Sequence, residues 1–542
     1  MELTSTRDPS LRIGFDEAVL RNLPDGAAPG GGAGGSAGSS AGGSARGSAE
    51  GGAGSAGSRA GSRAESGAGG SSGGSAGGGA GLFVPVALPR WSDVPELLQM
   101  PWEERCVEIL FRLLAPEYSR SDLEALVRDV FDFPVPLVEL NPESGGGQAR
   151  EGVAAVAGGA GRDRGAGGEP DPGASSAGPS PIAGGRLFAL ELFHGPSLAF
   201  KDFGARFLAA ILERLRDRAP AGAAGTAGAA GTRTVLTATS GDTGAAVAAA
   251  FWRRPGFRVV ILYPEGRVAP LQERQLACLG DNVTALAVAG TFDDCQRLAK
   301  ECFADRELAA GLGLTSANSI NVARLVAQIL YYFEALAQLD RRLPGVRPVV
   351  AVPSGNFGNL CAGLYAAALG LPVAGFVAAT NANRTVPDHL DGADFHPRPG
   401  IATLSNAMDV GDPSNWERIV ALFGGDVGAM AALRRTLRWG SLDDAETVAT
   451  LRGLWRRGYR ADPHGAVACG VLARLLRPGE TGIFLATAHP AKFQQALAPL
   501  GLDPPLPAAL QSLLSRPLRR ETLPLDATRL KARLRGIGSL RT

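Results

Sequence analysis

The sequence predicts an α/β protein with two open, twisted lobes of parallel sheet and a small N-terminal α/β domain. From about residue 233 onward, short runs rich in β-branched residues alternate with stretches of helical pattern. A parallel sheet with crossover helices requires this alternation. A long helical stretch then separates this first series from a second series that starts near residue 348. The two series indicate two lobes.

The first lobe is predicted from three consecutive strand-to-helix units. The expected strands cover residues 234–238, 258–263 and 283–288, and the expected helices cover 245–252, 268–279 and 293–303. Three such units in a row favour one compact lobe. The long helix that follows is expected over residues 322–338.

The second lobe resumes the same pattern, with strands predicted at residues 348–352, 373–379 and 482–486 and a helix at 360–369. The last two strands are apolar enough to be buried on both faces. In open α/β sheets, ligands bind at the carboxyl ends of the strands. The loops after Ala238, Val352 and Ala486 are therefore the candidate binding loops.

Low-complexity segments interrupt this pattern. Residues 27–80 contain no Leu, Ile, Val or aromatic side chain, so the tract is expected to be disordered. Residues 144–185 and 219–231 are nearly as poor in large apolar residues and are interpreted as enlarged loops. The predicted domains are an N-terminal domain over 1–132 that contains the first tract, a larger lobe over 133–232 and 340–500, a smaller lobe over 233–339, and a C-terminal helical segment over 501–542.

Composition favours a small-molecule substrate. The formal net charge is +1, and no basic cluster alternates with aromatic residues, which argues against nucleic acid. We find neither a signal-peptide pattern nor an apolar run of 18 residues, so we expect a cytoplasmic protein without a membrane span. The six cysteines show no C-x-x-C spacing and the five histidines no ligand spacing, so we expect buried thiols and no metal site.

Lysine is rare in this chain, and its distribution singles out one residue. Only four of the 54 Lys and Arg residues are lysines: Lys201, Lys300, Lys492 and Lys531. Arginine stays charged and cannot form an imine, so a lysine retained against this preference indicates a need for its amine. Lys201 lies between Phe200 and Phe203, and an apolar pocket would lower its pKa. The alternative is a surface lysine at the start of a helix over 202–215; Lys300 and Lys531 are interpreted as solvated.

Two glycine-containing loops lie between a predicted strand and a helix. In Pro353-Ser354-Gly355-Asn356-Phe357-Gly358-Asn359, backbone N–H groups and a helix N-terminus could together bind a phosphate. Thr239-Ser240-Gly241-Asp242-Thr243-Gly244 could hold a carboxylate or a phosphate in the same way. The alternatives are an ordinary tight turn and an ordinary helix N-cap. Two anion-binding loops and a nucleophilic lysine favour a phosphorylated cofactor that forms an imine, and pyridoxal phosphate meets that requirement.

At these residues the sequence resembles the threonine synthases, pyridoxal-phosphate enzymes of fold type II, the fold of the tryptophan synthase β chain. The start of the chain, at Ser5-Thr6-Arg7, is also similar, and the similarity resumes at Gly81 after the low-complexity tract. The segments that carry the resemblance are H-G-P-S-L-A-F-K-D-F, A-T-S-G-D-T-G-A-A, Y-P-E-G-R-V-A-P-L-Q-E, T-S-A-N-S-I-N-V-A-R, P-S-G-N-F-G-N, A-T-L-S-N-A-M-D-V-G-D-P-S-N-W and A-T-A-H-P-A-K-F.

The resemblance implies a carbon–oxygen lyase of threonine biosynthesis, which converts O-phospho-L-homoserine and water into L-threonine and phosphate. Lys201 would be the catalytic residue, first as the imine partner of pyridoxal phosphate and then as a proton shuttle. The larger lobe would bind the cofactor. The resemblance places Asp242 near the cofactor ring hydroxyl, where relatives often have Asn, and Thr487 opposite the pyridine nitrogen. The cofactor phosphate would be held by Gly355, Asn356, Phe357, Gly358 and Asn359.

The resemblance also implies a substrate site in the smaller lobe. Ser240 and Gly241 would hold the substrate carboxylate, and Thr243 would hold the substrate as well, either there or together with the residues that bind its phosphate group. The substrate phosphate would be held by Asn318, Ser319 and Arg324, since the arginine fork can bind phosphate oxygens in pairs. Lys492 would face the active site or cap a loop. The oligomeric state is left open.

Two alternative functions share many of these residues. A threonine or serine dehydratase of the same fold would use Lys201 and both glycine loops but would have no need of a substrate-phosphate site. A non-catalytic relative could bind phosphorylated amino acids or act as a scaffold through its Gly/Ser tracts. A dehydratase is distinguished by an Arg324→Ala variant, which should lose activity on O-phospho-L-homoserine only in a threonine synthase. A non-catalytic relative is distinguished by the absence of a visible absorption band that borohydride removes.

Overall fold

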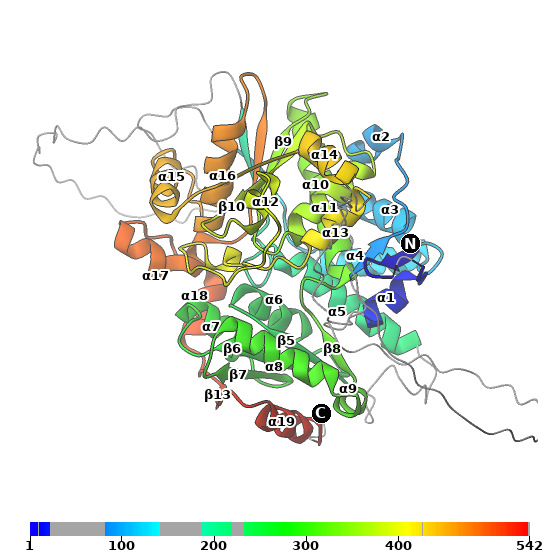
Figure 1. The fold of residues 1–542 in the computed structure, drawn as a ribbon, viewed down its shortest axis with the longest axis vertical. Coiled ribbons are helices and arrows are strands. Elements are labelled where there is room, and N and C mark those ends of the chain that lie inside the picture. The colour runs from blue at the N-terminus through cyan, green and yellow to red at the C-terminus, as the bar shows by residue number, and fades with distance from the viewer. Residues whose placement is uncertain (9, 22–81, 141–185, 219–231, 425–426, 540–542) are drawn as a thin grey trace, which may run out of the picture.

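The computed structural model describes residues 1–8, 10–21, 82–140, 186–218, 232–424 and 427–539. Its two large sheets lie in separate halves of the molecule, one carrying the strands β9 and β10 and the other β5 to β7 (Figure 1). The tract predicted at 27–80 and the insertions at 144–185 and 219–231 lie outside the described residues. The α/β class with parallel sheets is confirmed.

The larger sheet has six strands in the order β11-β10-β9-β12-β4-β3. All neighbours are parallel except β3 and β4, which pair antiparallel at one edge. Parallel sheets are covered on both faces by their crossover helices, which agrees with the complete burial of β9 and β12. The strands are β3 (Leu137–Leu140), β4 (Leu187–Glu191), β9 (Val349–Pro353), β10 (Gly375–Thr380), β11 (Leu437–Ser441) and β12 (Gly482–Ala486).

The smaller sheet has five parallel strands in the order β13-β7-β6-β5-β8. Its edge strand β13 comes from the C-terminal segment, which we expected to be helical, so that segment returns to extend the smaller sheet. The helix α19 then packs on α8 and α9 of the same lobe (Figure 1). The strands are β5 (Arg233–Ala238), β6 (Phe257–Pro264), β7 (Val283–Val288), β8 (Leu314–Ser316) and β13 (Arg520–Leu523).

A third sheet joins the two parts of the N-terminal region. Strand β1 (Leu3–Ser5) pairs antiparallel with β2 (Phe83–Pro85), which follows the low-complexity tract. In addition, the Thr6 N–H donates to the Leu82 carbonyl at 2.9 Å. The two sides of the tract therefore belong to one structural unit, as an insertion requires. The proposed domain limits themselves stay a prediction.

Helices connect the strands, and several begin at capping boxes that satisfy the free N–H groups of the first turn. Such boxes are present at Ser119, Thr291 and Asp443. The helices are α1 (Phe15–Arg21), α2 (Val94–Gln99), α3 (Trp102–Leu114), α4 (Arg120–Val130), α5 (Lys201–Arg218), α6 (Asp242–Phe251), α7 (Pro270–Ala277), α8 (Phe292–Ala304), α9 (Arg306–Leu312), α10 (Val322–Arg342), α11 (Gly358–Ala368), α12 (Thr385–Leu390), α13 (Trp416–Leu422), α14 (Val427–Thr436), α15 (Asp444–Arg456), α16 (Pro463–Leu475), α17 (Gln494–Leu497), α18 (Ala508–Leu514) and α19 (Ala527–Ser539), with 3₁₀ turns η1 (Asn406–Met408), η2 (Pro490–Phe493) and η3 (Ala498–Leu500).

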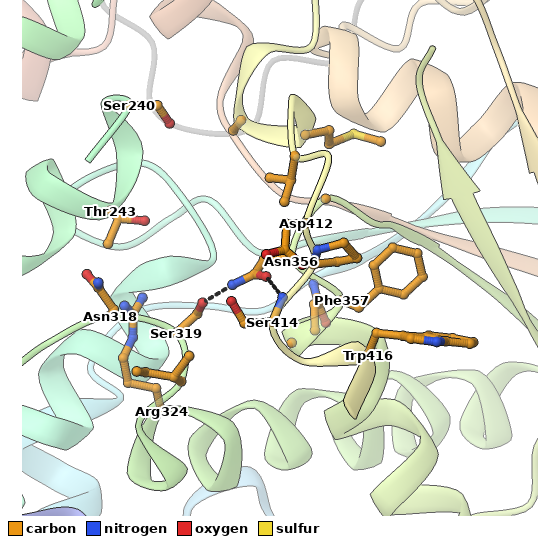
Figure 2. A pocket seen from close by; sticks show the side chains of 18 of the residues that line it. Ser240, Thr243, Asn318, Ser319, Arg324, Asn356, Phe357, Asp412, Ser414 and Trp416 are labelled. Carbon is orange, nitrogen blue, oxygen red and sulfur yellow. Dashed lines mark hydrogen bonds between the residues drawn. The ribbon is translucent and has the colours of Figure 1, made fainter. Parts of the chain in front are cut away.

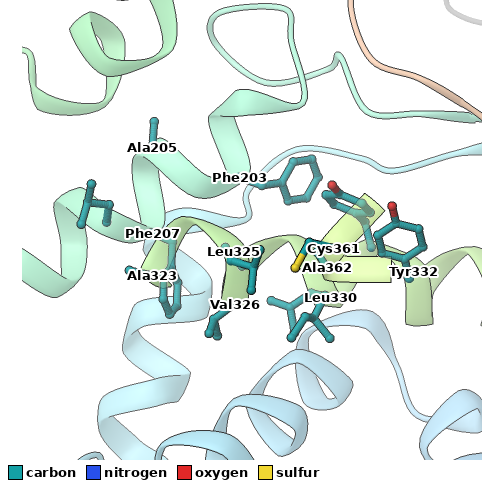
Figure 3. Packing of buried hydrophobic residues seen from close by; sticks show 14 of the residues in the cluster. Phe203, Ala205, Phe207, Ala323, Leu325, Val326, Leu330, Tyr332, Cys361 and Ala362 are labelled. Carbon is teal, nitrogen blue, oxygen red and sulfur yellow. The ribbon is translucent and has the colours of Figure 1, made fainter. Parts of the chain in front are cut away.

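The central core packs α10 against α5 and α11. Phe203 and Phe207 of α5 meet the apolar side of α10, while Cys361 and Ala362 of α11 pack against α10 near Leu330 (Figure 3). A methyl group at Gly204 would lie 3.0 Å from the Cβ of Arg324, so this glycine lets α5 and α10 approach closely. The close approach brings the first turn of α5, with Lys201, next to the first turn of α10.

Two expectations from composition can be compared with the structure. All six cysteines are buried and free, as predicted. Among the described residues, we find no helix that is both long and apolar enough to cross a bilayer.

Candidate active site

A cavity of about 760 Å³ opens at the carboxyl ends of the strands of both large sheets. The loops after β5, β9 and β12 reach it, as the sequence predicts for ligand binding in an open α/β sheet. Among the predicted site residues, only Gly241 does not line this cavity. Those that line it are Lys201, Ser240, Asp242, Thr243, Asn318, Ser319, Arg324, Gly355, Asn356, Phe357, Gly358, Asn359 and Thr487. Residues from five separate segments thus meet in one place.

Lys201 is the first residue of α5, and its side chain is 16% exposed. Its Nζ lies 3.7 Å from Oδ2 of Asp242 and 5.7 Å from the centre of the Phe200 ring. Burial lowers the pKa of Lys201 to about 8 against the opposing effect of the Asp242 carboxylate. Phe203, expected to border the lysine, packs instead in the core, 4.9 Å from the Phe133 ring. The pKa of this amine therefore lies much closer to neutral pH than that of an exposed lysine.

Asp242 begins α6 and is almost fully buried. Its Oδ1 lies 2.7 Å from Nζ of Lys492 and accepts a hydrogen bond from Nε2 of Gln272 at 2.8 Å. Burial alone would raise the pKa of Asp242, but the ammonium groups of Lys492 and Lys201 outweigh it and hold the pKa well below its usual range. Asp242 is thus a permanent carboxylate next to Lys201.

The loop between β9 and α11 has the geometry of an anion cradle. Phe357 caps α11 in the left-handed conformation, with φ of 58°, and the first helical turn leaves its N–H groups without intrahelical acceptors. A methyl group at Gly355 would lie 2.7 Å from the Cα of Met408, and one at Gly358 would lie 3.2 Å from Nδ2 of Asn415. Glycine at 355 therefore lets the backbone at Met408 close against the loop, whereas a methyl group at 358 would require Asn415 to shift by a few tenths of an ångström.

Asn359 supports the same interpretation of the loop. Its Oδ1 accepts hydrogen bonds from the hydroxyl groups of Tyr331 at 2.6 Å and Tyr332 at 2.7 Å, which fixes the orientation of the amide. Its Nδ2 is buried and has no acceptor among the described residues. A buried donor without an acceptor is costly. A phosphate in the cradle would supply the missing acceptor, so these residues fit the predicted cofactor.

Arg324 provides a second, separate site for an anion. The guanidinium is buried, with Nη1 donating to the Ala317 carbonyl at 2.5 Å, and Nε has no acceptor among the described residues. Burial lowers the pKa of Arg324 to about 10, and Asp202 opposes this. A buried cation that lacks a carboxylate in contact is unfavourable unless an anion joins it. Arg324 therefore fits a phosphate ligand.

Two polar residues stand beside Arg324 at the cavity wall (Figure 2). Asn318 accepts a hydrogen bond from the Thr237 hydroxyl at 2.7 Å, so its Oδ1 is occupied and its amide N–H groups are left to donate. The hydroxyl of Ser319 accepts a hydrogen bond from Nδ2 of Asn356 at 2.7 Å. This contact joins the segment of Asn318 and Ser319 to the loop over residues 353–359, called the phosphate loop below, so the two candidate anion sites share one wall.

Sequence reasoning assigned no role to the segment that supports the phosphate loop. The Ser414 N–H donates to Oδ1 of Asn356 at 2.6 Å (Figure 2). In addition, Nδ2 of Asn415 donates to the Asn356 carbonyl at 3.0 Å. The fully buried Arg418 in turn binds Oδ1 of Asn415 at 2.7 Å and the Ile320 carbonyl at 2.5 Å. The resemblance of residues 402–416 was the available signal. Arg418 thus connects Asn415, which supports the loop at Asn356, to the segment at Ile320.

Thr487 follows β12 and is buried at the cavity wall. Its carbonyl accepts a hydrogen bond from the Phe200 N–H at 2.9 Å, which ties the loop to the residue just before Lys201. Lys300, interpreted as a solvated residue, is exposed but also lines the cavity. Lys531 pairs with Asp305 at 3.0 Å, and neither residue lines the cavity.

Replacement of Gly355 by alanine is expected to weaken the binding of pyridoxal phosphate by about tenfold or more. The new methyl group would collide with backbone atoms of residues 407 and 408, and such overpacking costs about 1–3 kcal/mol. Titration of the cofactor-free variant, followed by absorbance, measures the dissociation constant. Gly311→Ala is the control, since its methyl group would meet no atom within 4 Å. Equal affinity in the Gly355→Ala variant would contradict the assignment of this loop.

Comparisons with known proteins agree with this geometry. A family model described as pyridoxal-phosphate dependent enzyme matches residues 169–487, and one described as threonine synthase, C-terminal, matches residues 465–533. The chain is 42% identical to the threonine synthase of Haemophilus influenzae, over 84% of this chain and 93% of that protein. It is also 42% identical to the threonine synthase of Escherichia coli, over 83% of this chain and 92% of that protein.

Solved structures show the same likeness. The crystal structure of threonine synthase from Escherichia coli superposes with a TM-score of 0.73 at 37% identity, over 99% of this chain and 100% of that one. The structure of pyridoxal-phosphate-bound threonine synthase from Brucella melitensis superposes with a TM-score of 0.73 at 28% identity, with both chains fully covered. The similarity therefore includes both lobes and the segments that line the cavity.

Proposed function

The chain belongs to the threonine synthase family of pyridoxal-phosphate-dependent enzymes, and from this membership we propose that its substrate is O-phospho-L-homoserine. The products would be L-threonine and inorganic phosphate, with water as the second reactant. The single observation that supports this substrate is the buried Arg324, whose Nε has no acceptor in a cavity that also contains a separate anion cradle. A phosphorylated amino acid and a phosphorylated cofactor together require two such sites. The cytoplasmic location stays a prediction from the sequence.

We propose that the cofactor is held by the residues of the phosphate loop, by Thr487 at its ring nitrogen and by Lys201. When bound, pyridoxal phosphate withdraws electrons from the substrate amine, so that protons next to it can be removed. Asp242 carries a negative charge 3.7 Å from the Lys201 amine and would stabilise a positive charge there. A carboxylate at this place differs from the neutral asparagine common among enzymes of this fold.

The chain's own residues supply proton transfer and positioning. Freed from the cofactor, the Lys201 amine would take a proton from Cα of the substrate and then serve as acid and base at Cβ and Cγ. Its pKa near 8 suits both directions of transfer. Ser240 and Thr243, beside the start of α6, would hold the substrate through N–H and hydroxyl groups. Gly241 does not line the cavity, and its N–H already donates to the Thr239 hydroxyl at 2.9 Å within the loop.

The phosphate group has to leave from Cγ, and its position decides which bond breaks. Asn318, Ser319 and Arg324 project into the cavity from one loop and the first turn of α10 (Figure 2). Charge-assisted hydrogen bonds from these donors would hold the leaving group in one orientation and stabilise the charge that develops on it. A water molecule would then add at Cβ. The hydrogen bond between Asn356 and Ser319 would fix the leaving-group site relative to the loop that holds the cofactor phosphate.

The experiment that tests this proposal measures phosphate release from O-phospho-L-homoserine and identifies the amino-acid product. We expect one phosphate and one L-threonine for each substrate consumed, with product identity established by chiral chromatography. Formation of ammonia and a 2-oxo acid from unphosphorylated threonine or serine at a higher rate would overturn the substrate assignment in favour of a dehydratase. Absence of turnover on all three substrates, with cofactor bound, would overturn it in favour of a binding protein.

A further inference from the structure

Lys492 lies in the 3₁₀ turn η2 with its ammonium group buried beneath the active-site cavity, and its side chain is 0% exposed. Nζ contacts Oδ1 of Asp242 at 2.7 Å and donates a hydrogen bond to the Ser197 carbonyl at 2.8 Å. Lys492 is not among the residues that line the cavity. Burial of an ammonium group away from solvent is unfavourable unless a neighbouring negative charge pairs with it.

The neighbouring charge is the carboxylate beside the catalytic lysine. Oδ1 of Asp242 is saturated, because it binds Lys492 and also accepts a hydrogen bond from Gln272. Oδ2 is left to face Lys201 at 3.7 Å. The three side chains therefore form a row of charges, positive at Lys492, negative at Asp242 and, when protonated, positive at Lys201.

We propose that Lys492 is a positioning residue of the active site, whose ammonium neutralises Asp242 and holds it in place so that Lys201 can release its proton and bond the cofactor. This inference rests on the proposed function, because it assigns to Lys201 the bond to the cofactor aldehyde. That bond needs a neutral amine, whose lone pair attacks the aldehyde carbon while one water molecule leaves.

The sign of the effect follows from the charges. A buried carboxylate paired only with Lys201 would favour the protonated amine, since an opposite charge within about 4–6 Å stabilises the charged form. Lys492 already supplies a positive charge to Asp242, so Lys201 faces an ion pair of zero net charge instead of a bare carboxylate. Consistently, Asp242 raises the pKa of Lys201 and Lys492 lowers it.

The other charged groups around this row are few and come from neighbouring elements. Arg324 of α10 acts on Lys201 and lowers its pKa. His464 of α16 lowers the pKa of Asp242, and the charge of Lys492 lowers the pKa of Asp202 of α5. Burial raises the pKa of Asp202 to about 6. The variants below leave all three groups unchanged, so shifts in Lys201 can be assigned to the Asp242 and Lys492 charges.

The test measures the protonation of Lys201 directly in the full-length chain freed of cofactor. Trace acetylation across a pH series, located by mass spectrometry, gives a labelling midpoint for each lysine, and the chain has only four. For Lys492→Met we expect the Lys201 midpoint to rise by about one pH unit or more. For Asp242→Asn we expect it to fall, and for the double variant to return to the wild-type value. Lys531, which pairs with Asp305, is the internal control.

Two further measurements keep the inference testable if the single Lys492→Met chain does not fold. Lys492→Arg keeps the positive charge, so the labelling midpoint of Lys201 should stay at its wild-type value. The midpoint should also be lower in Asp242→Asn than in the double variant, in which it should again equal the wild-type value. In the holoenzyme, the pH titration of the visible absorption band should shift in the same directions. An unshifted midpoint in Lys492→Met, or a double variant that behaves like Asp242→Asn alone, would overturn the inference. None of these readouts depends on threonine being formed, so failure of the proposed substrate would be seen separately.

Discussion

Replacement of Lys201 by alanine is expected to remove the visible absorption of the purified protein and to lower turnover by at least about 10³-fold. Among the described residues two lysines line the cavity, and of these Lys201 is mostly buried whereas Lys300 is exposed. Loss of the Lys201 amine removes both the covalent link to the cofactor and the group that moves protons. Absorbance spectra with and without sodium borohydride, together with steady-state phosphate release, measure the two effects.

The matched control is Lys531→Ala, which removes a lysine from α19 and breaks its ion pair with Asp305; neither residue lines the cavity. Exposed ion pairs contribute about 1 kcal/mol or less. The control should therefore keep the absorption band and the turnover of the parent chain. If the Lys201→Ala variant retained a borohydride-sensitive band, another lysine would have to hold the cofactor and the assignment would be wrong.

The parallel lobes could be predicted because their strands carry strong local signals. The predicted strands at 283–288 and 482–486 have the limits of β7 and β12, both rich in apolar side chains. The expected helices at 268–279 and 360–369 begin or end one or two residues away from α7 and α11, which reflects the weak sequence signal at helix ends. β13 was not predicted, because three of its four residues are exposed and its place in the sheet comes from a long-range return of the chain.

The candidate site shows the same division between local and long-range information. Lys201 and the glycine loops stand out locally, because residue type and spacing indicate their chemistry. The contact between Asp242 and Lys492 joins residues 250 positions apart and appears only when both lobes are folded. The support of the phosphate loop by Asn415 and Arg418 likewise depends on packing between segments. A sequence pattern therefore predicts the chemistry of a residue more directly than it predicts which residues will lie next to it in the folded chain.

Replacement of Arg324 by alanine is expected to lower kcat/KM for O-phospho-L-homoserine by at least about 100-fold, since the loss of one partner of a buried, hydrogen-bonded charge pair costs about 2–5 kcal/mol. Arg324→Lys should recover only part of this loss, because an ammonium cannot bind two phosphate oxygens through a planar fork. Cofactor binding should persist in both variants, since the phosphate loop is unchanged. Steady-state kinetics and the visible absorption spectrum together separate the two sites.

The same residue also predicts how the protein responds to inorganic phosphate. Arg324 is a buried cation with an unsatisfied Nε in the described structure, so binding of an anion should stabilise the folded state. Phosphate should therefore raise the melting temperature of the cofactor-loaded parent chain and should raise that of Arg324→Ala much less. Arg297→Ala, which removes an exposed arginine that pairs with Asp294 and Glu301 on α8, should respond like the parent. An Arg324→Ala chain that kept both full phosphate stabilisation and full activity would show that the leaving group binds elsewhere, and the dehydratase interpretation would then account better for Lys201 and the two glycine loops.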